Sequence, residues 1–226
     1  MLDSTNDEAK RLADAGEAGP LWIAAARQTA GRGRHGRRWE SLSGNLATTL
    51  LLMPERPQGE WPQLSFAAAI AATDTMAGFA PGARIAVKWP NDVLADGKKL
   101  AGILLERAGP MLAIGIGVNL AHFPEGTEFP ATSLAGFGVV PPSPDQALTA
   151  LAAQFAKWYE VWRGQGFAPL RDAWLARASG LGQPIRARLP DGERRGVFEG
   201  IDATGALLLK EGTGTRAISA GEVFFG

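Results

Sequence analysis

The order of apolar and polar residues divides the first third of the chain into alternating helical and extended segments. Near the N-terminus, Ser4 or Thr5 can cap a helix whose first turn is acidic and which Gly16 can end. The apolar run at residues 21–26 is typical of a strand. An Ala-rich segment over about residues 61–79 predicts a helix that is buried on much of its circumference.

The pattern then changes to short β-rich runs between residues 83 and 120. Turn signals such as Asp96-Gly97 and Gly109-Pro110 separate them. Short runs of this kind, joined by tight turns, predict an antiparallel meander. The runs are ARIAVKWP, NDVLA, KKLAGILLER and MLAIGIGVNL.

Helical spacing returns at residues 141–166, where Ser143 can cap a long helix and Pro144 suits its first position. Large apolar residues fall on one stripe of this helix, which predicts a core-facing side. The stripe consists of Leu148, Leu151, Phe155, Trp158 and Trp162. A second helix is predicted near residues 169–178.

Short strands make up the rest of the chain, with turns such as Asp191-Gly192 and Gly212 to Gly214. They predict a small β-barrel docked on the preceding part, because so few residues bury little core on their own. The boundary near Ser179 divides the chain into a domain of residues 1–178 and a domain of residues 179–226.

The amino-acid composition limits the kinds of catalytic and metal-binding site that the chain can form. The 226 residues include no cysteine and two histidines, which excludes disulfides, thiolate catalysis and Cys- or His-rich metal sites. Any metal would be a hard cation on oxygen ligands. The 23 basic and 23 acidic residues balance, so a general affinity for nucleic acid or membranes is not expected. No signal peptide or membrane span is recognisable, and we expect a cytoplasmic protein.

A basic local site is nevertheless present in GRGRHGRRW, residues 31–39, here called the Arg loop. Gly31, Gly33 and Gly36 have the G-x-G-x-x-G spacing of a dinucleotide-binding turn. That function requires a helix directly after the loop, and the following residues lack helical spacing. Glycines interleaved with arginines instead indicate a binding site for a phosphate-like anion. The alternative is a solvated basic turn.

Four segments in this order carry a resemblance to a known family: DSTND, RQTAGRGRHGRRW, KWPNDV with KKLAGILLE, and GIGVNL. Together they resemble the biotin protein ligases over nearly the whole chain. The resemblance implies an α/β (α+β) fold similar to class II aminoacyl-tRNA synthetases, with a mixed, largely antiparallel sheet, flanking helices and a C-terminal SH3-like barrel. Only Met1 to Asp3 precede the STN of this first motif, so a monofunctional form without the DNA-binding winged helix is expected.

The activity implied is a two-step acyl transfer. Biotin and ATP, with Mg²⁺, give biotinyl-5′-AMP and pyrophosphate, and the biotin then passes to a lysine of a biotin carboxyl carrier protein. Because two anions react in the first step, fixed positive charge is needed at the transition state. The resemblance also gives the Arg loop the task of closing over the adenylate.

The resemblance assigns residues to three tasks. The residues implied in catalysis are Lys99, Arg34 and Asp92. Those implied in biotin binding are Ser4, Thr5, Gln28, Gly31, Arg32, Gly33, Arg34, Lys99, Gly102, Gly115 and Gly117. Those implied in binding ATP or the adenylate are Arg34, Arg37, Trp39, Lys88, Asn91, Asp92, Lys99 and Asn119.

Several alternatives stay open. Asp92 can contact Mg²⁺, orient the attacking amine as a base, or simply cap a turn. Strand glycines such as Gly102 indicate that something approaches the backbone closely. Glu106 can be merely exposed, and Lys98 is expected on the strand face opposite Lys99.

Other functions remain to be weighed as well. Lipoate or octanoate attachment is the related enzymatic alternative, although those enzymes usually carry an Arg-Arg-Gly-Gly-Gly loop. A phosphate- or nucleic-acid-binding module is the alternative from another class, and a silent biotin-storing relative is a third. A homodimer is possible.

Overall fold

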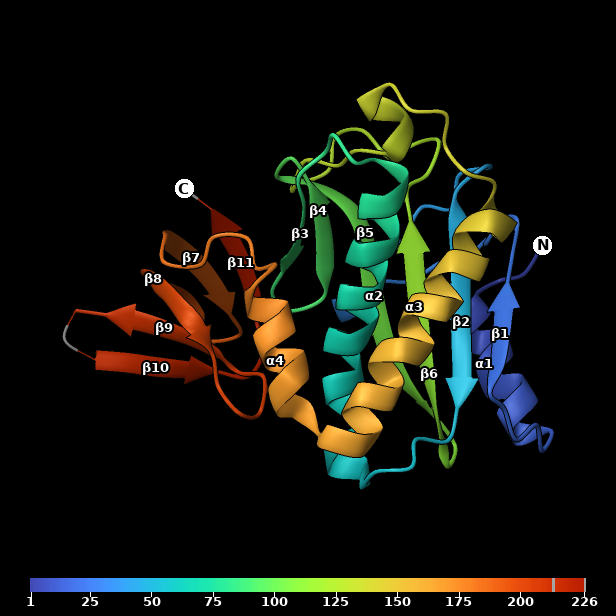
Figure 1. The fold of residues 1–226 in the computed structure, drawn as a ribbon, viewed down its shortest axis with the longest axis horizontal. Coiled ribbons are helices and arrows are strands. Elements are labelled where there is room, and N and C mark those ends of the chain that lie inside the picture. Colours follow the sequence, from blue (N-terminus) through green and yellow to red (C-terminus); the bar gives the residue numbers. More distant parts are fainter. Residues whose placement is uncertain (213, 226) are drawn as a thin grey trace.

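The computed structural model describes residues 1–212 and 214–225. Thr213, in a predicted turn, and Gly226, at the end of the predicted C-terminal domain, lie outside the described residues. The larger of two sheets has six strands in the order β1-β2-β6-β5-β4-β3 (Figure 1). Its strands are β1 (Leu21–Ala24), β2 (Leu46–Leu52), β3 (Ile85–Lys88), β4 (Asp92–Ala95), β5 (Lys98–Ala108) and β6 (Met111–Val118).

The predicted meander is confirmed, because β3 to β6 are consecutive antiparallel neighbours. β2 then pairs with β6, and β1 forms the far edge. Parallel pairing occurs as isolated bridges, such as that between Lys99 and Ala131. The described residues 40–45, which follow the Arg loop, lead into β2 without forming a helix, as expected from their sequence.

Helices cover both faces of this sheet (Figure 1). α2 (Leu64–Phe79) and α3 (Pro144–Gln165) pack on one face, and α1 (Thr5–Asp14) packs on the other. Strand alternation explains the two cores: Leu50 of β2 joins the large cluster under α2 and α3, whereas Leu51 joins the smaller cluster under α1. The sheet is therefore the middle layer of three.

Most predicted helix ends are confirmed. Ser4 is the N-cap of α1, and its hydroxyl accepts from the amide of Asp7 at 3.4 Å. Ser143 caps α3 in a capping box with Gln146, with Pro144 at the first turn. The predicted apolar stripe of α3 faces the core.

Two helices differ from the prediction in their bounds. α2 begins at Leu64, because residues 58–63 close i→i+3 hydrogen bonds as a 3₁₀ helix. α4 (Phe167–Leu175) begins and ends earlier than the predicted 169–178. The 3₁₀ segments are η1 (Arg34–Gly36), η2 (Gln58–Gln63) and η3 (Leu134–Phe137). No described helix is long and apolar enough to cross a membrane.

The predicted C-terminal β-structure is a five-stranded antiparallel sheet in the order β10-β9-β8-β7-β11. It contacts the rest of the protein through Trp89, whose Nε1 donates to the carbonyl of Gly205 at 3.0 Å, and through Glu222 of the edge strand β11, which pairs with Arg37. Its strands are β7 (Pro184–Leu189), β8 (Gly192–Ile201), β9 (Leu207–Glu211), β10 (Gly214–Ile218) and β11 (Glu222–Phe225).

Candidate functional site

A cavity of about 390 Å³ opens on the α1 face of the larger sheet. The start of α1, the Arg loop, strands β5 and β6 and the segment 124–131 supply its walls, together with two residues of β11. Every residue predicted for the site lines this cavity except Gly31, which is buried behind it. The structure thus brings together four motifs that are far apart in the chain.

Strand register builds the floor of the cavity. Successive antiparallel pairs place Lys88, Asp92, Gly102, Gly117 and Ala47 in one row across β3, β4, β5, β6 and β2. Directly opposed residues of antiparallel strands point to the same face. One end of the row is therefore charged, and the middle has no side chains.

Close approach to the strand glycines was predicted, and the structure shows what approaches them. A Cβ atom on Gly117 would lie 2.4 Å from the Trp39 ring, and one on Gly102 would lie 3.2 Å from it. On Gly115, a Cβ would lie 2.3 Å from Oδ1 of Asn6. The glycines therefore make room for the Trp39 ring and the Asn6 amide.

The charged end of the floor holds two ammonium groups around one carboxylate. Nζ of Lys99 lies 2.6 Å from Oδ1 of Asp92, and Nζ of Lys88 lies 3.7 Å from Oδ2. Lys88 also lies 3.9 Å from the centroid of the Phe129 ring. Burial lowers the pKa of Lys88 to about 8, although the Asp92 charge opposes this shift.

A β-bulge decides which way Lys99 points. Strict alternation along β5 would put Lys99 on the opposite face from Gly102. The register with β4 shifts, however, between the pairs Asp92–Gly102 and Leu94–Lys99. The shift turns Lys99 into the cavity, while Lys98 is exposed, as predicted.

The Arg loop folds back on itself as a short hairpin. The Trp39 amide donates to the Gly31 carbonyl at 2.9 Å, and the Gly33 amide donates to the Arg37 carbonyl at 2.7 Å. The tip is the 3₁₀ turn η1, in which His35 has a φ of 56°. Gly31 serves this hairpin through its backbone and does not line the cavity.

Arg34 brings a positive charge of the loop into the cavity without a carboxylate partner among the described residues. Its Nη1 donates to Oδ1 of Asn91 at 3.5 Å, and burial lowers its pKa. Within residues 1–212 and 214–225, Arg34 has no salt bridge to a carboxylate. It is thus a cation whose remaining N–H donors have room for an anion.

The start of α1 supplies neutral polar groups to the same wall. Thr5 donates to Oε1 of Gln28 from its amide at 2.7 Å and from its hydroxyl at 3.1 Å. Oγ1 of Thr49, on β2, lies 2.8 Å from the Thr5 hydroxyl and 2.6 Å from Oδ1 of Asn6. The first turn of the helix is therefore tied to the sheet and to the residues that lead into the Arg loop.

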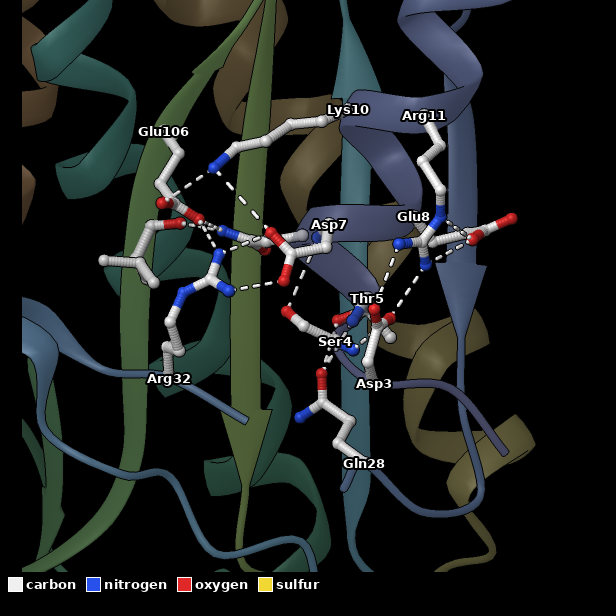
Figure 2. A network of polar contacts seen from close by, with 12 residues as sticks. Asp3, Ser4, Thr5, Asp7, Glu8, Lys10, Arg11, Gln28, Arg32 and Glu106 are labelled. Atoms are coloured by element: carbon white, nitrogen blue, oxygen red, sulfur yellow. Dashed lines mark hydrogen bonds and ion pairs between the residues drawn. The ribbon is translucent and has the colours of Figure 1, made fainter. Parts of the chain in front are cut away.

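Arg32 is held differently from Arg34. Its guanidinium is paired in a bidentate manner with Asp7, and its Nη2 donates to Oε2 of Glu106 at 3.2 Å (Figure 2). Nζ of Lys10 donates to the other oxygen of Glu106 at 3.0 Å. Exposure was one alternative left open for Glu106, and the structure instead shows a half-buried side chain, because β5 points it at α1 and the loop.

Two predicted amides are fixed by backbone carbonyls. Nδ2 of Asn91 donates to Ile103 at 2.6 Å, and Nδ2 of Asn119 donates to Thr132 at 3.0 Å. Both residues line the cavity. Their oxygen atoms are consequently held in defined directions.

Sequence reasoning missed the contribution of β11. Glu222 forms an ion pair with Arg37, and Phe224 lies with its ring centroid 5.7 Å from Nζ of Lys88. Local spacing carries no signal for these contacts, because the partners are more than a hundred residues apart in the sequence. Asn6, beside the predicted Ser4 and Thr5, was also missed, although its place in the first turn of the helix points to the same wall.

Comparison with known proteins gives two family matches. Residues 1–120 match the Biotin/lipoate A/B protein ligase family, and residues 180–226 match the Biotin protein ligase C terminal domain.

Individual relatives agree with these matches. A biotin–acetyl-CoA-carboxylase ligase of Paracoccus denitrificans is 48% identical, covering 99% of this chain and 98% of the relative. The Mycobacterium tuberculosis protein of the same name is 37% identical, covering 97% and 85%. The structure of the Aquifex aeolicus biotin protein ligase in complex with biotin and ATP superimposes with a TM-score of 0.85 at 26% identity, covering 99% and 94%. This chain belongs to the biotin protein ligase family.

Proposed function

We propose that this chain is a biotin protein ligase that activates biotin with ATP and transfers it to a lysine of a biotin carboxyl carrier protein. The names of the Paracoccus and Mycobacterium relatives and the biotin and ATP in the Aquifex complex support the proposal. The acceptor follows from the relatives' names, in which acetyl-CoA carboxylase is the protein acted on.

One observation carries the proposal: two lysines flank a single carboxylate at one end of a glycine floor, and Arg34 lines the same cavity. Lys88, Lys99 and Arg34 line the cavity around Asp92, so the charged end has a surplus of positive charge. A carboxylate and a triphosphate must meet there as two anions, and buried fixed cations stabilise their transition state more than water does. The middle of the floor carries no strand side chains, and the Trp39 ring lies on it beside the charged end.

In the first step, a biotin carboxylate oxygen forms a bond to the α-phosphorus of ATP, and the bond to the β-phosphate oxygen breaks. Lys99 and Arg34 hold the reacting carboxylate and α-phosphate, and Lys88 and Arg37 hold the leaving pyrophosphate. The hydroxyls of Ser4 and Thr5, with the amide of Gln28, bind the biotin ureido group, and Trp39 and Asn119 contact the nucleotide. These assignments are predictions from position in the cavity.

In the second step, the acceptor lysine amine attacks the acyl carbon, AMP leaves, and the amine loses a proton. Asp92 has either of two tasks, since its carboxylate can orient this amine or contact Mg²⁺ in the first step. Among the described residues no group of three or more His, Cys, Asp or Glu side chains is placed to hold a metal ion. We therefore place Mg²⁺ on the ATP phosphates, as part of the substrate.

Three further points stay predictions. The division into domains of residues 1–178 and 179–226 is one, the homodimer is another, and the cytoplasmic location is the third. Each is compatible with the proposed activity, and none is needed for the chemistry of the cavity.

The test measures pyrophosphate release from Mg-ATP with biotin, lipoate, octanoate or no acid, and then transfer to an isolated carrier domain. Release that requires biotin, followed by labelling of one carrier lysine, is expected. Release with lipoate or octanoate alone would move the protein to the sister activity. No release with any acid, together with salt-sensitive nucleic-acid binding, would contradict the proposal in favour of a binding module.

A further inference from the structure

Arg32 and Arg34 are two residues apart in the Arg loop, yet their charges are used in opposite ways. The guanidinium of Arg34 has no carboxylate partner among the described residues. The guanidinium of Arg32 is shared by Asp7, from the first turn of α1, and Glu106, from β5 (Figure 2). Its positive charge is thereby neutralised before any ligand arrives.

We propose that Asp7, Glu106 and Arg32 form a clamp that anchors the first half of the Arg loop, so that the loop opens only beyond Gly33. Arg32 is then a positioning residue whose side chain holds the loop to the protein. The turnover measurements that test this inference rest on the proposed function, whereas the protease-cleavage measurements rest on the structure alone.

The geometry of the clamp favours this role over a chance surface contact. Nη2 of Arg32 donates to Oδ1 of Asp7 at 2.7 Å, and the second N–H of the fork pairs with Oδ2, so the contact is bidentate. The side chains of Arg32, Asp7 and Glu106 are 33%, 27% and 25% exposed, which limits screening by solvent. The pKa of Asp7 is lowered by its hydrogen bond from Arg32.

The clamp is also joined to the floor of the cavity. Nδ2 of Asn6 donates to Oε2 of Glu106 at 2.7 Å, and Oδ1 of Asn6 lies against Gly115. Lys10 supports Glu106 from the next turn of α1. The anchor of the loop and the wall of the cavity are therefore one network, and the loop's entry is fixed relative to the glycine floor.

The second half of the loop is held less firmly. Arg37 has the single ion pair with Glu222, and residues 35–38 are exposed. Gly33 precedes the tip and Gly36 ends it, and both provide backbone freedom, with Gly36 at a φ of 72°. A clamp before Gly33 and a freer tip after it give a loop whose first half is fixed more firmly than its tip.

The first test is limited trypsin cleavage of the full chain without substrates. In the wild type we expect cuts after Arg34, Arg37 and Arg38 and protection after Arg32. Asp7→Asn should raise cleavage in the loop about tenfold, which corresponds to about 1.4 kcal/mol, and should add the cut after Arg32. Asp7→Glu keeps the carboxylate and should restore protection.

Glu8→Gln is the matched control. Glu8 and Asp7 are both acidic residues in the first turn of α1. Neutralising either one therefore removes the same kind of favourable interaction with the helix dipole. Glu8 pairs with Arg11 on the side of α1 away from the loop (Figure 2). Trypsin should therefore cleave the Glu8→Gln variant at the same rate and sites as the wild type. Equal rates and equal cut sites for Asp7→Asn and Glu8→Gln would overturn the clamp.

Arg32→Lys provides a second variant that leaves α1 unchanged. A lysine keeps the charge but lacks the fork that pairs with one carboxylate while reaching another, so cleavage should rise as in Asp7→Asn. In turnover, both variants should release more biotinyl-AMP per biotin transferred, whereas Glu8→Gln should not. If the wild type makes no adenylate but the cleavage pattern holds, the proposed function fails and the clamp stands.

Discussion

Gly117→Ala tests whether the glycine floor positions Trp39. The new Cβ would lie 2.4 to 2.6 Å from three atoms of the indole ring, and ordinary contact begins near 3.4 Å. The ring must therefore retreat by about 1 Å. A displacement of this size at a reacting site costs about 100-fold in rate when it misplaces the substrate.

The same substitution should leave the protein folded. Alanine in a strand is favoured over glycine by about 0.5 to 1 kcal/mol, and overpacking typically costs about 1 to 3 kcal/mol. The free energy of unfolding should then fall by no more than about 2.5 kcal/mol. Loss of activity would consequently report on the position of the ring.

The assay compares biotin-dependent pyrophosphate release with urea unfolding for each variant. Gly214→Ala is the matched control, because Gly214 also lies in a strand and a Cβ there meets nothing within 4 Å. A double variant with Trp39→Phe should recover part of the lost rate, since the smaller ring relieves the contact. If Gly117→Ala kept the wild-type kcat and KM, the idea that activity requires the space that Gly117 leaves for the Trp39 ring would be refuted.

Three further predictions follow from the charges of the cavity. Lys99→Met should lower the rate of adenylate formation by about 10²- to 10³-fold with an unchanged circular dichroism spectrum, and near-normal single-turnover rates would contradict this. Arg34→Gly removes a cation without a carboxylate partner, so escape of biotinyl-AMP should rise about ten- to a hundredfold, measured by labelling of a bystander protein. Because burial lowers the pKa of Lys88 to about 8, its charge is present below that pH and lost above it. The KM for ATP should therefore rise above about pH 8 in the wild type but not in Lys88→Arg, as followed by initial rates.

Local sequence signals predicted the framework of this protein well. The caps at Ser4 and Ser143, the meander of β3 to β6 and the exclusion of a dinucleotide turn all depend on contacts within a few residues. The glycines of β5 and β6 also indicated a close approach, because a strand glycine is costly unless something requires the space. In each case the physical cause lies near the residues that carry the signal.

Long-range pairing explains what the sequence could not predict. Glu106 meets Arg32 across 74 residues, and Glu222 meets Arg37 from another sheet. Such contacts depend on how strands and helices are placed in space, and no spacing rule links the partners. The sequence therefore left the exposure of Glu106 open, and the fold decided it by bringing β5 next to α1 and the Arg loop.

The direction of Lys99 shows most clearly how the site depends on a departure from regular structure. A regular β5 pointing Gly102 into the cavity would also point Lys98 there and turn Lys99 away. The register shift against β4 keeps Gly102 on the floor and brings Lys99 to within 2.6 Å of Asp92. With regular pairing and the present chain length the two lysines would be exchanged, and the cavity would receive its cation from Lys98, which is now exposed. The bulge is thus as much a part of the charged site as the lysine that it directs.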